Sequence, residues 1–245
     1  MYKAIVTGHS RGLGAALANE LLARGGQVLG ISRAGNPGLA ANYPGAFQEL
    51  ALDLSDQAGL ASFLASGRLE RFLAGADLAV LINNAGVLQP MGAPGRQGGA
   101  AIALAVTANV AAPLMLSDAF VAATSNLSDR RIAHVSSGAA RSAYAGWSVY
   151  CATKAALDMH ARAVKADALP GLRISSIAPG VIDTAMQAEI RAAESSVFPL
   201  HERFEALKHK GELATPEDTA RRFVGYLLSA AFGQDPAPDL RTLVT

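Results

Sequence analysis

The chain is 245 residues long, 51% hydrophobic and 17% charged, with a formal net charge of +1. This composition supplies a large apolar core and excludes an intrinsically disordered protein. The balanced charge, with lysines and arginines scattered along the chain, leaves no electrostatic footprint for nucleic acid or an anionic membrane surface. The single cysteine, Cys151, excludes a disulfide framework and a cysteine-rich zinc site.

The sequence predicts no targeting or membrane segment. The N-terminus reaches Gly8 after only a few apolar residues, too few for a signal peptide. The most apolar long stretch, Ala100–Leu116, contains Thr107, Asn109 and Pro113, and we expect it to be too short and too polar to span a bilayer. We therefore expect a cytoplasmic protein that binds neither membranes nor nucleic acid.

Short β-branched or apolar runs alternate with longer segments whose apolar residues recur at helical spacing. The predicted strands are Lys3–Thr7, Gln27–Ile31, Ala46–Leu52, Leu78–Ile82, Arg131–Ser136, Leu172–Ala178 and Leu240–Val244. The predicted helices are Gly12–Arg24, Gln57–Leu73, Ala101–Ala123, Ser148–Ala168 and Pro216–Ala230. This alternation predicts an α/β fold, a doubly wound parallel sheet of about seven strands with helices on both faces, in three layers.

The chain contains no internal repeat and no linker rich in glycine, proline or serine, so we expect a single domain over residues 1–245. Two segments lie outside the alternation, Gln89–Gly99 and Thr184–Gly211. Ligands of doubly wound sheets bind at the carboxyl ends of the strands, where both segments are expected. We interpret residues 184–211 as an insertion that shapes a substrate site.

A glycine-rich loop follows the first predicted strand and leads into a predicted helix. The loop reads Thr7-Gly8-His9-Ser10-Arg11-Gly12-Leu13-Gly14. Glycines permit a tight turn and let the backbone approach a pyrophosphate, whose charge is stabilised at a helix N-terminus. The strand-loop-helix context favours a dinucleotide site over an ordinary turn.

The end of the second predicted strand indicates which dinucleotide is bound. NAD sites usually place a carboxylate there to bind the ribose diol, but no Asp or Glu occurs between Glu20 and Glu49. Ser32 and Arg33 occupy this place, and Arg11 can approach it from the glycine-rich loop. Arginine offers charge-assisted and often bidentate hydrogen bonds to a phosphate, so we expect NADP (NADPH). The alternative is that both arginines are solvated surface residues.

Further polar features recur where the later strands end and on two predicted helices. In chain order they are Asp53-Leu54, Asn83-Asn84-Ala85-Gly86, Asn109, Ser137, the pair Tyr150 and Lys154 at helical i, i+4 spacing, and Pro179-Gly180. Their order and distances closely resemble the short-chain dehydrogenase/reductase family over essentially the whole chain. The resemblance implies a Rossmann-like fold, a nicotinamide cofactor and hydride transfer between that cofactor and a carbonyl group.

Carried over residue by residue, the resemblance makes Tyr150 the general acid for carbonyl reduction. Lys154 then binds the nicotinamide ribose and lowers the pKa of the tyrosine, because a nearby positive charge favours the phenolate. Ser137 hydrogen-bonds the substrate oxygen as negative charge develops there. Ser136 is its rival, and the spacing to Tyr150 favours Ser137. Asn109 holds a water that links Lys154 to solvent.

The resemblance also implies a set of cofactor contacts along one edge of the sheet. They are Gly8, Ser10, Arg11, Gly12, Leu13, Gly14, Ser32, Arg33, Asp53, Leu54, Asn83, Ala85, Gly86, Tyr150, Lys154, Pro179, Gly180, Ile182 and Thr184. Asp53 and Leu54 are assigned to the adenine, and Asn83, Ala85 and Gly86 to the nicotinamide ribose. The five histidines show no ligand spacing, so no metal site is expected.

Three segments resemble the benzil and sepiapterin reductases of this family: Gly146–Lys154, Pro179–Arg191 and, for benzil reductases especially, Arg203–Lys208. The resemblance implies reduction of 1,2-diketones such as benzil by NADPH. Apolar residues expected around the nicotinamide suit an aryl group; they are Leu88, Met91, Tyr144, Trp147, Ile182 and Met186. Ordinary core packing is the alternative for Trp147, Met186, Phe198 and Phe204.

Other functions remain open at this point. A pterin side-chain reductase, or another alcohol dehydrogenase of the family, is the first alternative. A dinucleotide-sensing protein without catalysis is more distant, because such proteins usually break the tyrosine-lysine pair, which is intact here. The family usually associates through the helices that carry Asn109 and Tyr150, so the resemblance implies a homodimer or homotetramer.

Overall fold

The computed structural model describes residues 1–194 and 198–243. Its centre is one sheet of six parallel strands in the order β3-β2-β1-β4-β5-β6. The strands are β1 (Tyr2–Thr7), β2 (Gln27–Ser32), β3 (Phe47–Ala51), β4 (Leu78–Asn83), β5 (Arg130–Val135) and β6 (Leu172–Ile177). The strand order reverses between β1 and β4, which confirms the doubly wound, Rossmann-like α/β fold.

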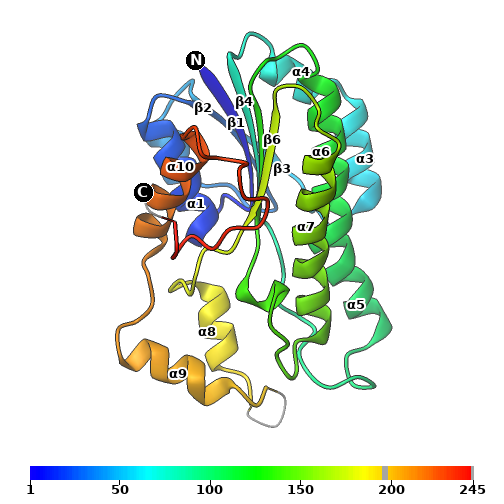
Figure 1. Cartoon of the computed structure of the whole chain (residues 1–245), viewed down its shortest axis with the longest axis vertical. Helices are drawn as coiled ribbons and strands as arrows, with labels where there is room; N and C mark the ends of the chain where they lie inside the picture. Colours follow the sequence, from blue (N-terminus) through cyan, green and yellow to red (C-terminus); the bar gives the residue numbers. More distant parts are fainter. Residues whose placement is uncertain (195–197, 244–245) are drawn as a thin grey trace.

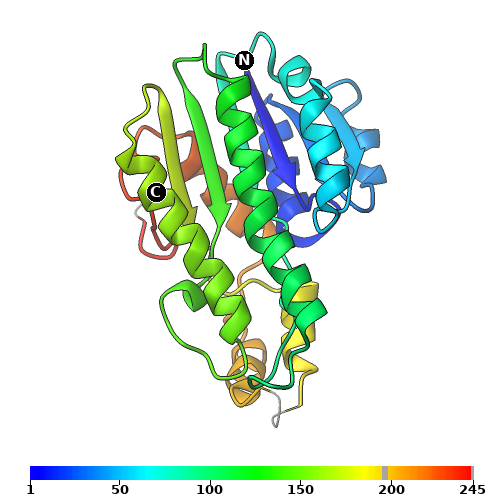
Figure 2. The ribbon, with the colours of Figure 1, turned by 90° about the vertical axis from the view of Figure 1, so that its right-hand side faces the viewer.

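Helices cover both faces of the sheet and extend beyond its lower edge (Figures 1 and 2). One face carries α1 (Gly12–Ala23), α2 (Pro37–Asn42) and α10 (Pro216–Leu228). The other carries α3 (Gln57–Ala65), α4 (Arg68–Leu73), the continuous run α5 (Gly99–Val106), η1 (Thr107–Ala111) and α6 (Ala112–Ala123), and α7 (Ser148–Ala166). The remaining elements are the turn η2 (Gly138–Ala140) and the helices α8 (Ala185–Arg191) and α9 (His201–His209). In Figure 1, α8 and α9 lie past the carboxyl ends of the strands.

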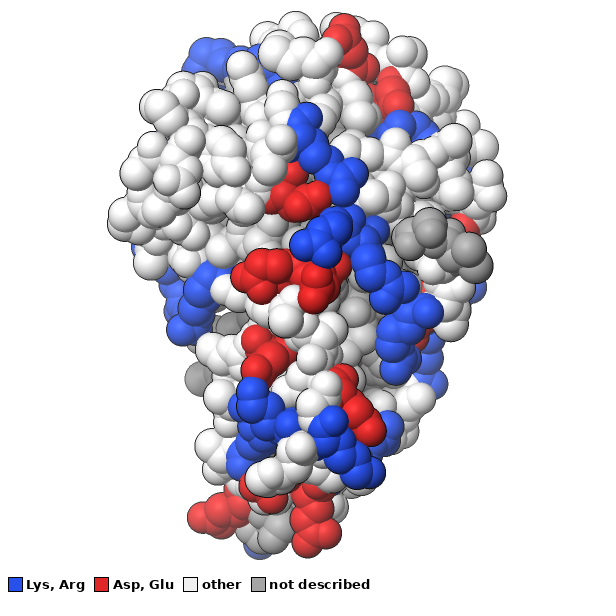
Figure 3. All heavy atoms as spheres, turned by 90° about the vertical axis from the view of Figure 1, so that its left-hand side faces the viewer, with Lys and Arg blue, Asp and Glu red and all other residues white. Residues whose placement is uncertain are grey.

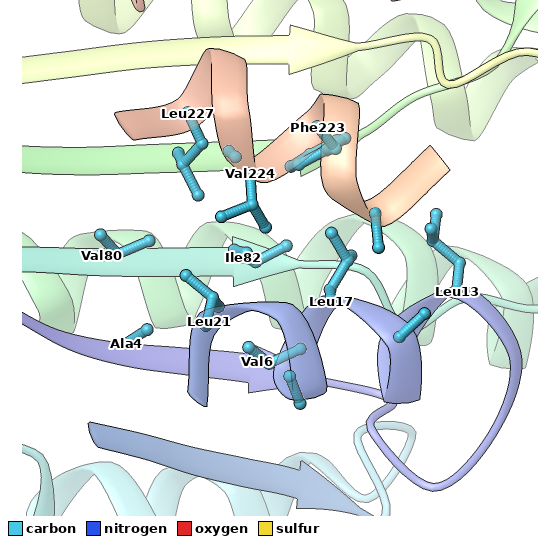
Figure 4. Packing of buried hydrophobic residues seen from close by; sticks show 14 of the residues in the cluster. Ala4, Val6, Leu13, Leu17, Leu21, Val80, Ile82, Phe223, Val224 and Leu227 are labelled. Carbon is cyan, nitrogen blue, oxygen red and sulfur yellow. The ribbon is translucent and has the colours of Figure 1, made fainter. Parts of the chain in front are cut away.

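Strand periodicity divides the core into two layers. Successive residues of a strand point to opposite faces, so Ala4 and Val6 of β1 enter one apolar cluster while Ile5 enters the other. In Figure 4, α1 and α10 pack together over the first of these layers. From α1 and α10 come Leu13, Leu17, Leu21, Phe223, Val224 and Leu227, which meet Val80 and Ile82 of β4. The sheet is therefore buried on both faces and ligands reach it only at its edges.

The predicted seventh strand, Leu240–Val244, is wrong over the residues that the structure describes. Residues 240–242 form a turn, Leu243 has no regular structure, and an isolated bridge joins Asp239 to Ala178; Val244 lies outside the described residues. The N–H groups of Arg241 and Thr242 donate to the side chain and the carbonyl of Asp239, so the chain turns there and does not continue as a strand.

The predicted helix Gln57–Leu73 is two helices. Gly67, between α3 and α4, has a φ of 67°. Only glycine adopts this left-handed conformation without strain, so the chain turns there and a new helix begins. The helices α2, α8 and α9 were not predicted from the sequence.

Residues 100–116, expected to be too short to span a bilayer, belong to a longer continuous helix, Gly99–Ala123. It has 25 residues, and by length and composition alone it could cross a membrane. Ala112, Leu116 and Phe120 are buried against the sheet, as in the core helix of a soluble protein, which passes the same test.

Charges of both signs are mixed on the face of the molecule shown in Figure 3. Ion pairs on α1 and α10 include Arg24 with Glu20 at 2.7 Å and Arg221 with Asp218 at 2.8 Å. Such exposed pairs contribute little to stability.

Candidate active site

The glycine-rich loop lies between the end of β1 and the start of α1. Gly8 and Gly12 have φ angles of 73° and 56°, which favour glycine. A Cβ on Gly14 would lie 2.0 Å from the carbonyl oxygen of Gly8, so no larger residue fits where α1 meets the loop. The first turn of α1, which includes Leu13, contains no acidic residue. Its free N–H groups therefore fit a pyrophosphate.

The loop after β6 crosses in front of the glycine-rich loop. A Cβ on Gly12 would lie 3.5 Å from Cγ2 of Thr184, the residue that precedes α8. Gly180 has a φ of 90°, and Ile182, which is 8% exposed, bridges to Ala214. The segment that begins at Pro179 thus closes one wall of the expected cofactor site.

The end of β4 is clamped to β1 by Asn84. Its Nδ2 donates to the carbonyl of Thr7 at 2.9 Å, while the Thr7 hydroxyl accepts from the N–H groups of Asn84 and Ala85 at 2.9 and 3.0 Å. These bonds fix the chain where the strand order reverses, which is where doubly wound sheets bind ligands.

Asn83 does not direct its side chain to the cofactor side. The residue is 2% exposed, and its Nδ2 donates to Ser117 Oγ at 3.3 Å and to His134 Nδ1 at 3.1 Å. These partners lie between the sheet and α6. Any contact of Asn83 with the nicotinamide ribose is therefore left to its backbone, and the assignment of Asn83 to that site stays a prediction. Gly86 does lie at the site: a Cβ there would be 3.6 Å from the Lys154 Nζ.

Asn109 lies in a π-helical turn, a distortion that often marks functional sites. Its Oδ1 accepts from the N–H of Val87 at 2.8 Å, and its Nδ2 donates to the Val87 carbonyl at 2.8 Å and to Thr153 Oγ1 at 3.2 Å. The side chain thus links the β4 loop to α7.

Tyr150 and Lys154 lie on the buried face of α7. The Lys154 Nζ donates to the Val135 carbonyl at 2.8 Å and lies 5.7 Å from the centroid of the Tyr150 ring. Burial raises the pKa of Tyr150 to about 12, opposed by a hydrogen bond with Ser137. Burial lowers the pKa of Lys154 to about 8, opposed by the charge of Asp158. In this arrangement burial outweighs the lowering of the tyrosine pKa expected from Lys154, so Tyr150 is protonated at neutral pH.

The two serines after β5 have different surroundings. Ser136 is 3% exposed and its hydroxyl donates to Asp158 Oδ1 at 2.6 Å. Ser137 is half-buried, accepts from the N–H of Ala139 at 3.1 Å and hydrogen-bonds with Tyr150. Ser137 is therefore the serine beside the tyrosine.

Two exposed arginines lie at the expected adenosine end of the site. Within residues 1–194 and 198–243, no carboxylate forms an ion pair with Arg11 or Arg33. Asp53 accepts from the backbone N–H and hydroxyl of Ser55 at 2.9 and 2.7 Å. These bonds lower the pKa of Asp53, with a smaller contribution from the charge of Arg33.

Other residues near this end are held by the protein itself. The Ser32 hydroxyl donates to the Ala34 carbonyl at 2.5 Å, and Leu54 is buried in the core. Ser10 is half-buried in the glycine-rich loop, where its carbonyl accepts from Asn36 Nδ2 at 3.5 Å.

Glu49 is a carboxylate near this end that the sequence did not reveal. It lies on β3, and its Oε1 accepts from His9 Nε2 at 3.0 Å and from the N–H of Asn36 at 2.5 Å. The carboxylate is thus committed to protein partners and joins the glycine-rich loop to the segment after β2. Only the pairing of β2 with β3 brings these residues together.

An aromatic cluster that includes Tyr150 lies beside the tyrosine-lysine pair. Five of the six apolar residues expected around the nicotinamide belong to it, whereas Ile182 packs in the core layer beneath α10. The members of the cluster include Leu88, Met91, Tyr144, Trp147, Met186, Ile190, Phe198 and Phe204. Trp147 stacks on Phe198 with ring centroids 4.5 Å apart and meets Tyr150 edge-on at 5.5 Å. The indole Nε1 of Trp147 is buried without a hydrogen-bond partner in the described part of the chain.

The fold and this site define a dinucleotide-dependent oxidoreductase with a tyrosine-lysine pair. The short chain dehydrogenase family matches residues 2–195, and the chain belongs to that family. It is 34% identical to a benzil reductase that forms (S)-benzoin, from Bacillus cereus, over 94% of this chain and 95% of that protein. It is 33% identical to the sepiapterin reductase of Meriones unguiculatus over 93% and 92%.

A solved structure resembles the chain over nearly its full length. It is a short-chain dehydrogenase/reductase from Burkholderia vietnamiensis, 49% identical, with a TM-score of 0.72 and coverage of 99% of this chain and 98% of that one. Among the described residues, no three His, Cys, Asp or Glu side chains lie close enough to hold a metal ion.

Proposed function

We propose that this protein is an NADPH-dependent reductase of 1,2-diketones such as benzil. The observation that carries the proposal is the aromatic cluster over Tyr150, which joins the segment after β5 to α8 and α9. Rings arranged in this way bind an aryl group by apolar burial and edge-on packing. The likeness to benzil reductase over almost the whole chain supports the same substrate class.

The polar groups beside the cluster support reduction rather than binding alone. When bound, the nicotinamide supplies the hydride. Tyr150, protonated at neutral pH, donates the proton to the carbonyl oxygen, and Ser137 stabilises the negative charge that develops there. Lys154 holds the ribose side of the site, and Asn109 fixes the loop at Val87 against α7. The buried indole N–H of Trp147 offers a donor for the second carbonyl of a diketone.

The preference for NADPH rests on the exposed arginines Arg11 and Arg33. The free guanidinium groups suit a 2′-phosphate, and Glu49 is already bound to His9 and Asn36. Charge-assisted contacts of about 1.5–3 kcal/mol each, reduced by solvent exposure, predict a preference of about tenfold or more. Arg33→Ala is expected to weaken NADPH binding far more than NADH binding.

The decisive experiment is a carbonyl panel assayed with NADPH and with NADH. Benzil, 2,3-butanedione and a pterin carrying a diketone side chain are compared by initial rates. Reduction of benzil with the higher kcat/KM for NADPH supports the proposal. Activity confined to the pterin would place the enzyme with the sepiapterin reductases, and equal kcat/KM with both cofactors would remove the NADPH claim. Cofactor binding without reduction of any carbonyl would indicate a sensing protein.

We also propose that the protein is a cytoplasmic homo-oligomer that associates through α5 and α7. Leu104 and Val106 on the first helix and Met159 on the second are 48%, 44% and 64% exposed. Figure 2 shows these helices side by side on the outer face of the sheet. Light scattering of the purified protein tests this, and a monomer at micromolar concentration would contradict it.

A further inference from the structure

A buried carboxylate on α7 is not used by the roles described above. Asp158 is 6% exposed and follows Tyr150 and Lys154 at intervals of four residues, so the three side chains form a row along one face of the helix. Its Oδ1 accepts from Ser136 Oγ at 2.6 Å, and its Oδ2 accepts from Arg141 Nε at 3.1 Å. A buried carboxylate is stable only when partnered in this way.

The partners of Asp158 lie on both sides of Ser137. Ser136 precedes Ser137 directly and follows the end of β5. Arg141 follows the turn η2, which begins directly after Ser137. Arg141 also donates from Nη2 to the Pro238 carbonyl at 3.3 Å, which adds the C-terminal segment to the network. One carboxylate therefore holds both ends of the short segment that presents the Ser137 hydroxyl.

We propose that Asp158 is a positioning residue for the reaction: it fixes Ser137 through Ser136 and Arg141, and it supplies the counter-charge for the buried Lys154 ammonium. The inference rests on the roles proposed for Tyr150 and Lys154. It does not depend on which carbonyl is the substrate.

The charges around Lys154 determine whether a substitution raises or lowers the pKa of its ammonium group. Burial lowers the pKa of Lys154, and the Asp158 carboxylate opposes that lowering. The other groups facing the ammonium are the Tyr150 phenol, 5.7 Å from Nζ to the ring centroid, and His134 on β5, whose own pKa Lys154 helps to lower. Arg141 adds a positive charge on the far side of Asp158. If Asp158 is removed, the positive charge of Arg141 is left without a counter-charge and disfavours the Lys154 ammonium. If Arg141 is removed, the carboxylate of Asp158 stabilises the Lys154 ammonium alone.

Two variants with opposite expected pH shifts test whether Asp158 is the counter-charge of Lys154. Asp158→Asn is expected to move the alkaline limb of the pH profile of kcat to lower pH, by about one unit, which is about a tenfold loss at pH 9. Arg141→Gln is expected to move the same limb to higher pH. Initial rates with benzil and 2,3-butanedione give the profiles, and Asp158→Glu is expected to restore part of the wild-type profile.

A third variant tests the link to Ser137. Ser136→Ala removes the hydroxyl but keeps the carboxylate, so kcat is expected to fall several-fold without a shift of the alkaline limb. Asp129→Asn is the matched control. Asp129 is a partly buried carboxylate paired with Arg131 and Arg173 at the opposite end of β5, so its variant is expected to lose stability with an unchanged profile.

Titration of the Lys154 Nζ by NMR of ¹⁵N-lysine-labelled protein gives a second readout that needs no substrate. Its pKa is expected to be lower in Asp158→Asn and higher in Arg141→Gln than in the wild type. Titrations that superimpose in all three proteins would overturn the counter-charge, whatever the stability of the variants. If Asp158→Asn fails to fold, the upward shift in Arg141→Gln decides. Failure of the wild type to reduce either diketone would count against the proposed function alone, since the titration still decides this inference.

Discussion

The stability of this protein is expected to fall between pH 7 and pH 5 because of a buried histidine. His134 on β5 is fully buried; its Nδ1 accepts from Asn83 and its Nε2 lies 3.0 Å from His160 Nδ1. Burial, with smaller contributions from the charges of His160 and Lys154, lowers the pKa of His134 to about 3. In the unfolded chain the same group titrates near about 6.5.

The sign and size of the effect follow from these two pKa values. Below about pH 6.5 the unfolded chain binds a proton that the folded protein does not, so the free energy of unfolding decreases as the pH falls. For one histidine that stays neutral in the fold, the decrease between pH 7 and pH 5 is about 2 kcal/mol. The stabilisation is fully present above the unfolded pKa and is lost progressively toward pH 3.

The assay is urea unfolding of the wild type and of His134→Asn at pH 7, 6 and 5. Asparagine keeps an acceptor for Asn83 but does not titrate, so the variant is expected to lose about 2 kcal/mol less than the wild type over this range. His160→Gln measures the separate contribution of the half-buried neighbour, whose pKa burial also lowers. Equal losses in the wild type and in His134→Asn would refute the assignment.

Three further substitutions have clear expected outcomes. Gly14→Ala places a Cβ against the Gly8 carbonyl, so dinucleotide binding measured by fluorescence should be lost together with several degrees of Tm; unchanged binding would contradict the loop geometry. Trp147→Ala removes a 4% exposed ring stacked on Phe198 and should lower the free energy of unfolding by about 3–5 kcal/mol. It should also raise KM for benzil more than KM for 2,3-butanedione; equal effects on the two KM values would argue for core packing alone. Tyr150→Phe should reduce kcat by about 10² or more with cofactor binding retained, and an active variant would require another proton donor.

The fold could be predicted largely because its signals are local. Each of the six strands was predicted within two residues of its observed ends, since buried parallel strands are short continuous apolar runs. The prediction of a strand at Leu240–Val244 was wrong because its apolar residues resemble such a run, while Asp239 accepts the N–H groups of Arg241 and Thr242 in a turn. The helix break at Gly67 depends on a single backbone angle that periodicity does not reveal.

The site was less predictable where it depends on contacts between distant segments. Glu49 reaches His9 and Asn36 only because β3 pairs with β2 in this register. The sequence showed that the end of the second strand lacks a carboxylate, but it did not show that the next strand brings one nearby. Asn83 ends the same strand that precedes Asn84, yet strand alternation turns its side chain toward His134. A motif identifies the segment without fixing the direction of each side chain.

Asp158 is the exception, because a signal for it was present in the sequence. It continues the interval of four residues from Tyr150 through Lys154, and a carboxylate on the buried face of a helix requires partners. Trp147, just before α7, and Tyr150 belong to the aromatic cluster. Lys154 bonds the last residue of β5, and Asp158 bonds Ser136 just after it. In the proposed function, α7 therefore positions both the aryl-binding cluster and the groups that handle the proton. Substitutions that shift α7 along β5 should therefore change both together, whereas substitutions in α8 or α9 should alter the choice of substrate alone.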